Sequence, residues 1–252
     1  TRNPGLAYLL NYTGLKEINS NMVSFGIAPR INACGRMGHE EEALKLFLTK
    51  DVEEAKRITV KLNDFNTERQ EIEKGIFNEV ISQIEKKGLD KEPVIIVGSE
   101  NWHHGVIGIV ASKITDLYYK PSILVCFEDG IAKGSGRSIP GFDLHDALCK
   151  SGDLLLKYGG HEMAVGLSLE ESNFEQFCDR IEEISSNVNI EELVPILKID
   201  KEITSEDIKI EIIESLKLLE PFGEANKTPL FLYKNLKIDS IRRKAFKANF
   251  KR

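Results

Sequence analysis

Hydrophobic and polar residues follow two different patterns along the middle of the chain. Short, nearly continuous apolar runs are typical of buried strands, whereas apolar residues that return every three or four positions are typical of helices. Strand character is found at 93–98, 122–127, 131–138 and 162–169, and helical character at 106–119, 143–157 and 173–186. Strands that alternate with helices predict an α/β domain over residues 93–187, with helices on both faces of its sheet.

A long amphipathic helix is predicted ahead of this domain. Residues 40–87 have a helical pattern with an interruption near 49–51, and Asp51 is a suitable N-cap because acidic residues follow it in the first turn. Apolar residues then recur at spacings of three and four over roughly six turns, while the other faces are charged. Two lysines and Gly88 form a stop signal. We therefore expect residues 39–92 to form a helical strut with one buried stripe.

The two ends of the chain carry weaker patterns. Residues 1–38 include a short helical stretch, but a unit of fewer than about 40 residues needs outside support for its core. Residues 188–252 include strand-like runs at 197–203 and 230–241, with a helix between them at 208–219. Because the chain starts without methionine and stops just after a strand-like run, we expect both ends to be cuts through a longer protein.

Composition limits the class of protein. Hydrophobic residues make up 41% of the chain, which is enough for a sizeable core and too much for a disordered protein. No apolar run approaches the ~18 to 20 residues of a membrane span, so we expect no membrane partner. The four cysteines lack the paired spacing of a zinc site or a disulfide framework, which favours reduced thiols in a cytoplasmic protein.

The position of the charges matters more than their sum. The net charge of −6 argues against a nucleic-acid partner when it is taken as an average. Six basic residues nevertheless fall within 241–252, which holds no acidic residue, so the rest of the chain carries −12. Phe246 and Phe250 stand between these basic residues and could stack nucleic-acid bases; the alternative is a solvated strand with one buried face.

Three short segments combine residues that suit an anion. In the segment 134–138, Gly-Ser-Gly-Arg-Ser, the glycines would leave backbone N–H groups open as a nest, and the guanidinium would offer a planar fork for a phosphate or carboxylate. Taken alone, so short a segment is more often a tight turn with a surface arginine.

For the other two segments, too, a structural role is an alternative to anion binding. Gly159 and Gly160 follow a predicted helix, where they would allow a left-handed exit, and His161 would stand at the mouth of a strand, able to donate to an anion. A histidine there is more often a hydrogen-bonded structural residue. Arg30 and Arg36 follow a proline and could contact an anion, or they could be solvated residues of a domain-edge loop.

The adjacent His103 and His104 do not predict a metal site. Neighbouring residues point apart on a helix, and no carboxylate follows them at helical spacing. HxH, DxD and HExxH motifs are absent from the chain, as are a Walker A loop and a G-x-S-x-G elbow. We expect a strand-to-helix turn here, in which Gly105 and Gly108 allow the helix to pack closely on the sheet, and one histidine could face a cleft.

In order along the chain, five motifs closely resemble the RecJ family, the single-strand-specific 5′→3′ DNA exonucleases of the bacterial DHH phosphoesterase superfamily. They are Ala28–Arg36, Trp102–Ser112, Gly134–Ser138, Gly159–His161 and Leu219–Asn226. The similarity covers almost the whole chain. Each motif alone is weak, and the ordered set of five is specific.

The resemblance implies an α/β fold with a DHHA1-type mixed sheet flanked by helices, preceded by a long connecting helix and followed by a partial OB-fold-like segment. It divides the chain into 1–38, the end of the DHH catalytic domain; 39–92, the connecting helix; 93–187, the DHHA1 domain; and 188–252, the lead-in to and start of an OB-fold-like DNA-binding region. The family's metal-binding motifs, including its Asp-His-His, would precede Thr1. We therefore expect no catalytic residue and no metal ligand in this chain, and Mn²⁺ or Mg²⁺ only in the full-length enzyme.

The resemblance also implies roles for the residues that match the family's motifs. Its GSxRS loop holds substrate phosphate across a cleft from the metal centre, its GGH motif lines the same cleft, and Arg36 is the favoured DNA contact at the end of the catalytic domain. The implied substrate- and phosphate-binding residues are Ser135, Arg137, Ser138, Gly159, Gly160, His161, Arg36, Arg30 and Asn32. Ala225 departs from the family, which commonly has glycine there, and this affects a turn only.

The implied function is the C-terminal part of a metal-dependent exonuclease of DNA repair and recombination, which binds phosphate and single strands without cleaving them by itself. The implied partners are single-stranded DNA, a single-strand-binding protein and a helicase. Two alternatives stay open: the DHHA1 portion of an oligonucleotide or cyclic-dinucleotide phosphodiesterase, and a non-catalytic nucleic-acid-binding module. The long helix and the Pro-Phe-Gly segment at 221–223, ahead of a basic tail, favour the nuclease.

Overall fold

The predicted strut is present as one long helix, α5, Val52–Lys87. A computed structural model describes residues 2–14, 18–186, 194–235, 237–242 and 245–249. Asp51 caps α5, because its side chain accepts a hydrogen bond from the backbone N–H of Glu53 at 2.9 Å, and Gly88 ends the helix in the left-handed conformation. The buried apolar stripe consists of Ala55, Ile58, Leu62, Ile76, Val80 and Ile84. The capping signals and the stripe are thus confirmed.

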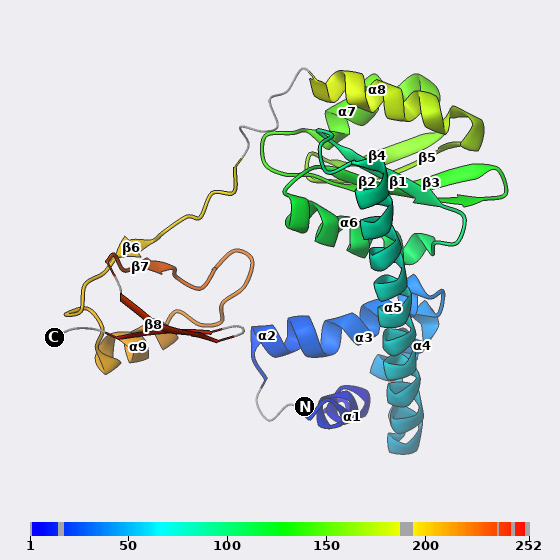
Figure 1. Cartoon of the computed structure of the whole chain (residues 1–252). Coiled ribbons are helices and arrows are strands. Elements are labelled where there is room, and N and C mark those ends of the chain that lie inside the picture. The colour runs from blue at the N-terminus through cyan, green and yellow to red at the C-terminus, as the bar shows by residue number, and fades with distance from the viewer. Residues whose placement is uncertain (1, 15–17, 187–193, 236, 243–244, 250–252) are drawn as a thin grey trace. The chain divides into compact units, whose positions relative to one another are not determined.

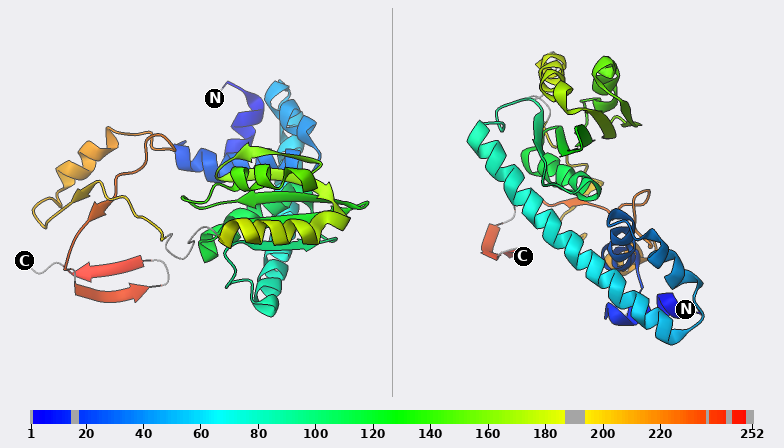
Figure 2. Two further views of the ribbon diagram at one scale, coloured as in Figure 1. Left: turned by 90° about the horizontal axis from the view of Figure 1, so that it is seen from above. Right: turned by 90° about the vertical axis from the view of Figure 1, so that its right-hand side faces the viewer.

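The chain divides into two units, Thr1–Gly14 with Ile27–Pro195 and Leu15–Gly26 with Ile196–Arg252. In the first unit, three shorter helices pack against the N-terminal half of α5 (Figure 1). They are α1, Pro4–Tyr12; α3, Ala28–Arg36; and α4, Glu40–Leu48. The C-terminal half of α5 packs against α6 and β1 (Figure 2), so this one helix connects the group of short helices to the sheet region.

The sheet of the first unit is mixed and has five strands in the order β1-β2-β3-β5-β4. Only β1 and β2 pair in parallel, and the other neighbours pair antiparallel. The strands are β1, Ile95–Ser99; β2, Ser122–Glu128; β3, Ile131–Arg137; β4, Lys157–His161; and β5, Ala164–Glu170. The predicted α/β fold class with a mixed sheet is therefore confirmed.

Helices cover both faces of this sheet, as the continuous apolar runs predict (Figure 1). On one face, α6, His104–Tyr118, packs mainly against β2 and β3, and its core with α5 is buried. On the other face lie α7, Leu144–Lys150, and α8, Phe174–Ser186, over a second buried cluster that includes Val125 and Phe177. The sheet therefore separates two cores.

The single helix predicted over 143–157 is wrong. α7 ends at Lys150, a 3₁₀ turn follows at Gly152–Leu154, and Lys157–His161 is the edge strand β4. The apolar run at 154–156 continues the helical pattern, but the strand after it is exposed at every residue and therefore shows no alternation. Gly159 and Gly160 therefore do not form a helix exit. Instead, Gly160 has φ +137 in the hairpin between β4 and β5, where an added Cβ would lie 2.2 Å from Ala164 O.

The second unit has shorter elements than the sequence predicts. Its helices and strands are α2, Ser20–Met22; β6, Lys201–Glu202; α9, Ile210–Lys217; β7, Phe231–Leu232; β8, Lys237–Arg242; and β9, Ala245–Asn249. The run predicted at 230–241 is interrupted because Asn235 adopts a left-handed φ of 59. The expectation that Phe246 and Phe250 stack bases concerns side chains that lie outside the described part of the chain. Short helical turns elsewhere are Val23–Ile27 and Glu171–Asn173.

Candidate functional site

A cleft of about 690 Å³ opens in the first unit where the end of α3 meets the start of α6 and the strand β3. Its lining residues come from segments far apart in the sequence. They are Ile31, Asn32, Gly35, Arg36, Glu40, Ala43, His104, Gly105, Gly108, Ser135 and Arg137. Four of the predicted binding residues, Asn32, Arg36, Ser135 and Arg137, are thus brought together in one place.

Two glycines of α6 make this convergence possible. A Cβ on Gly105 would lie 2.4 Å from Arg36 O, and a Cβ on Gly108 would lie 2.8 Å from Ser135 Oγ. The end of α3 and the strand β3 can therefore approach the first turns of α6 only because these positions lack side chains. His103 caps the helix, since its Nδ1 accepts a hydrogen bond from Gly105 N at 3.1 Å. The close packing of helix on sheet is therefore confirmed for Gly108, whereas Gly105 allows the close approach of α3 instead.

The cleft holds two guanidinium groups. Arg36 Nη1 donates to Gly105 O at 2.8 Å, and Arg137 Nη1 donates to Gly136 O at 2.7 Å and to Ser135 Oγ at 3.2 Å. Burial lowers the pKa of Arg137, and the charge of Arg36 lowers it further. Both side chains still carry their charge at neutral pH, because arginine remains protonated far above it. A bound anion would relieve their repulsion.

Among the described residues, no ion pair joins Arg36 or Arg137 to a carboxylate. Glu40 is the carboxylate among the lining residues, and it is exposed. The two guanidinium groups therefore remain available to a ligand. Two guanidinium forks and a hydroxyl suit a phosphate group, which can accept several charge-assisted hydrogen bonds at once.

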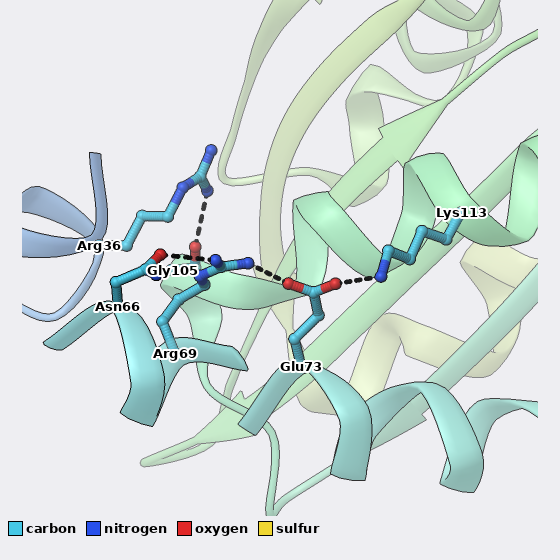
Figure 3. Close-up of polar contacts among 6 residues, drawn as sticks. All are labelled: Arg36, Asn66, Arg69, Glu73, Gly105 and Lys113. Atoms are coloured by element: carbon cyan, nitrogen blue, oxygen red, sulfur yellow. Dashed lines mark hydrogen bonds and ion pairs between the residues drawn. The ribbon is translucent and has the colours of Figure 1, made fainter. Parts of the chain in front are cut away.

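A buried polar network lies beside Arg36 and connects α5 to α6 (Figure 3). Glu73, 6% exposed, forms ion pairs with Arg69 of the same helix and with Lys113 of α6. Arg69 Nη2 also donates to Asn66 Oδ1 at 2.8 Å. Burial and the charge of Arg69 lower the pKa of Arg36, whereas Glu73 acts in the opposite direction. The network thus sets both the position of the strut and the charge next to the cleft.

These network residues were not among the predicted site residues. The signal that could have identified them is an arginine and a glutamate four residues apart, lying within the otherwise apolar stripe of the long helix. Lys113 offers no such signal, because its partner is 40 positions away. One histidine of the pair His103 and His104 was expected to be able to face a cleft, and His104 lines the cleft next to Gly105.

Two predicted residues lie outside the cleft lining. Arg30 donates from Nε to Asn63 Oδ1 at 3.2 Å, which directs it toward α5. Ser138 is buried, and its hydroxyl donates to Phe142 O at 2.7 Å. The backbone nest expected at 134–138 is also wrong, because residues 134–137 are part of β3, which pairs with β2 on one side and β5 on the other. Its backbone groups belong to the sheet.

Gly159, Gly160 and His161 also lie outside the cleft lining, on the edge strand β4. The strand register connects them to the cleft residues: Ser135 pairs with Gly166, which pairs with Gly159. Likewise Arg137 pairs with Ala164, which pairs with His161. Directly paired residues share a face of a sheet, so Gly159 and His161 lie on the same face as the two cleft residues of β3.

No group of three or more histidine, cysteine, aspartate or glutamate side chains that could hold a metal ion occurs among the described residues. The described helices also include none that is long and apolar enough to cross a membrane. The part of the chain that the structure describes therefore offers arginine, serine and backbone groups for binding a ligand, and no metal centre.

The fold and the cleft define a protein with a DHHA1 domain, whose family model matches residues 91–187. A second family model, the RecJ OB domain, matches residues 199–250. These two matches confirm the resemblance to the RecJ family that the five motifs carry. The exonuclease RecJ of Bacillus subtilis is 36% identical over 96% of this chain, and that of Thermus thermophilus is 35% identical over 90%.

The chain spans about a third of these two relatives, 31% and 32% of their respective lengths. Crystal structures of Thermus thermophilus RecJ with Mn²⁺ and with Mg²⁺ both match with a TM-score of 0.82, at 34% and 33% identity. Each match covers 92% of this chain, and 34% or 36% of the solved chain. Because the described residues form no ligand cluster for such an ion, they do not fit a metal site, and no chemical step is assigned to a metal in this chain.

Proposed function

We propose that this chain is the end-binding part of a single-stranded-DNA-specific 5′→3′ exonuclease, and that its cleft holds the 5′-terminal phosphate of the strand. The relatives that support this carry the name single-stranded-DNA-specific exonuclease. In the proposal, residues 1–38 end the DHH catalytic domain, 39–92 form the connecting helix, 93–187 the DHHA1 domain, and 188–252 the start of the OB-fold-like region.

One observation carries the proposal. Arg36 of α3 and Arg137 of β3 face one cleft with the Ser135 hydroxyl, and within the described part of the chain neither arginine has a carboxylate partner. A terminal phosphate offers more oxygen acceptors and more negative charge than an internal phosphodiester. The cleft therefore favours the end of a strand over its interior. Asn32, also in the lining, supplies a further polar contact.

In this role the chain positions its substrate. Arg36 and Arg137 would fix the terminal phosphate, and Ser135 would orient it by a hydrogen bond, which limits the positions available to the first phosphodiester linkage. Gly159 and His161 would contact the strand on the face of the sheet that they share with Ser135 and Arg137, and Gly160 would hold the β4–β5 hairpin that carries them. Arg30 and Ser138, which contact other parts of the protein, would act through the structure around the cleft.

The wider setting is also part of the proposal. The four cysteines are free thiols, which fits a protein of the reducing cytoplasm. A metal-dependent nuclease of repair and recombination, using Mn²⁺ or Mg²⁺ in the complete enzyme, is consistent with the ions in the solved relatives. A single-strand-binding protein and a helicase as partners rest on the family resemblance alone. The match to the RecJ OB domain supports the nuclease over an oligonucleotide or cyclic-dinucleotide phosphodiesterase.

Arg137→Ala tests the proposal by the affinity for a 5′-phosphorylated single strand, measured by fluorescence anisotropy. We expect a loss of ~1.5–3 kcal/mol, the range for a hydrogen bond to a charged group. Arg180→Ala is the matched control, because Arg180 pairs with Asp153 at 3.3 Å and belongs to α8 on the opposite face of the sheet. Equal affinities for Arg137→Ala and the unaltered chain would favour the non-catalytic interaction module instead.

A further inference from the structure

The turn between α3 and α4 brings a carboxylate to the cleft. Gly38 adopts a left-handed φ of 78 in this turn, so the chain reverses directly after α3. Glu40 and Ala43, which lie one turn apart on the same side of α4, both line the cleft. A carboxylate thus faces a space whose lining also holds the two guanidinium groups of Arg36 and Arg137.

The structure of α4 does not require an acidic residue at position 40. Acidic residues in the first turn stabilise a helix, but Glu41 and Glu42 stand in the same turn and supply this effect. Glu42 also pairs with Lys45 at 3.3 Å and with Lys61 at 3.5 Å. Glu40 has no such partner among the described residues. Its charge is therefore available to act on a ligand in the cleft.

Glu40 does not neutralise the two arginines of the cleft. Burial lowers the pKa of Arg36, and the charges of Arg69 and Glu73 act on it in addition. Burial and the charge of Arg36 lower the pKa of Arg137. Glu40 is not among the charges that shift either guanidinium, so both groups keep their attraction for an anion while a separate negative charge stands in the same cleft.

The size of the cleft does not select a single phosphate. Its volume of about 690 Å³ lies within the range of about 300–1,000 Å³ that holds drug-sized ligands, so phosphates in series have room. Two guanidinium groups by themselves would bind a triphosphate end more tightly than a monophosphate end, because the triphosphate carries more negative charge. A carboxylate in the lining opposes this preference, since its repulsion grows with the charge of the ligand.

We propose that Glu40 is a specificity-determining residue that restricts the cleft to 5′-monophosphate ends and disfavours ends that carry a triphosphate. The inference rests on the proposed function of the cleft and names the kind of end that the cleft accepts. A strand that was started from a nucleoside triphosphate keeps a triphosphate at its 5′ end, whereas a hydrolytic cut can leave a monophosphate there. The reaction that supplies the substrate is therefore a hydrolytic cut that leaves the phosphate on the 5′ end.

Glu40→Gln tests the inference with single strands of identical sequence that end in a 5′-hydroxyl, a 5′-monophosphate or a 5′-triphosphate, measured by fluorescence anisotropy at low salt. The unaltered chain should bind the monophosphate strand more tightly than the triphosphate strand. Glu40→Gln should shift the ratio of the two affinities about threefold to tenfold in favour of the triphosphate. Two unit charges 4 Å apart in water change an affinity by about fivefold; the added phosphates increase this effect, and distance and salt reduce it.

Glu41→Gln is the matched control. It removes the neighbouring acid of the same helix turn, from an exposed position outside the cleft lining, and should leave the ratio unchanged. Salt supplies a second measurement, because rising ionic strength shortens the Debye length and weakens the repulsion between exposed charges. The difference between Glu40→Gln and the unaltered chain should therefore shrink as salt is added.

Two results would overturn the role of Glu40. The first is tighter binding of the triphosphate strand than of the monophosphate strand by the unaltered chain. The second is a ratio that Glu40→Gln changes no more than Glu41→Gln does. The cleft itself still stands after either result if the monophosphate strand binds more tightly than the hydroxyl strand and Arg137→Ala removes that difference. If the hydroxyl and monophosphate strands bind equally, the proposed function itself fails.

Discussion

Replacing Glu73 with glutamine removes the negative charge that holds the strut α5 to α6. The side chains of Glu73 and Arg69 are 8% and 11% exposed, so their ion pair is largely shielded from water. Lys113, the second partner, is 54% exposed and can be hydrated when the carboxylate is gone. The perturbation therefore leaves one buried guanidinium without its counter-charge.

The expected loss of unfolding free energy is about 3 kcal/mol. Breaking a buried pair by removing one partner costs ~3–5 kcal/mol, and the lower end applies because Asn66 Oδ1 still accepts a hydrogen bond from Arg69. The exposed pair with Lys113 adds at most about 1 kcal/mol. Helix propensity does not contribute, since glutamate and glutamine are nearly equal in a helix.

Urea unfolding followed by tryptophan fluorescence measures this loss in the structural unit that contains α5. The only tryptophan, Trp102, is 6% exposed and packs in the same apolar cluster as the second half of α5. Glu71→Gln, at an exposed position of the same helix, is the control and should change stability by less than ~0.5 kcal/mol. In an Arg69→Met background, Glu73→Gln should cost much less. A loss below ~1 kcal/mol for Glu73→Gln alone would refute the claim that this network fastens the strut.

Three further outcomes are expected. Gly108→Ala should weaken binding of a 5′-phosphorylated strand without disrupting the helix α6, because the added Cβ would lie 2.8 Å from Ser135 Oγ and 3.2 Å from Arg137 Nη2. Undiminished binding would contradict the cleft geometry. A maleimide at pH 7.5 should label the exposed Cys149 before Cys178, since burial raises the pKa of Cys178 to about 12 and keeps its thiol protonated. Mass spectrometry that finds Cys178 labelled first would contradict this. Mn²⁺ should leave the unfolding midpoint unchanged, because no described cluster can hold it, and a rise of several degrees would reveal a site.

The sequence predicted the fold best where the determining contacts are local. The ends of α5 follow from Asp51 and Gly88, whose capping depends on their immediate neighbours. The strands at 93–98 and 122–127 are buried on both faces and appear as continuous apolar runs. The helix predicted at 143–157 failed because the apolar residues at 154–156 continue the helical pattern, although the chain forms a 3₁₀ turn after residue 150 and an exposed edge strand from Lys157.

The site was harder to predict because it depends on distant contacts. Arg36 meets Gly105 across 69 positions, and no local pattern can indicate that contact. The segment 134–138 was predicted as a phosphate-binding loop, yet residues 134–137 form a strand whose alternation directs Ser135 and Arg137 to one face, and Ser138, just after the strand, donates to Phe142 O instead. Gly136 lies on the opposite face of the sheet, where an added Cβ would lie 2.7 Å from the Leu144 side chain.

The central claim is that the cleft between α3, α6 and β3 binds a terminal phosphate. Its most direct test compares the affinity of this chain for two single strands of identical sequence, one with a 5′-phosphate and one with a 5′-hydroxyl. The account predicts tighter binding of the phosphorylated strand by about tenfold or more, the equivalent of ~1.4 kcal/mol, and predicts that Arg137→Ala abolishes the difference. Equal affinity for the two strands would contradict it.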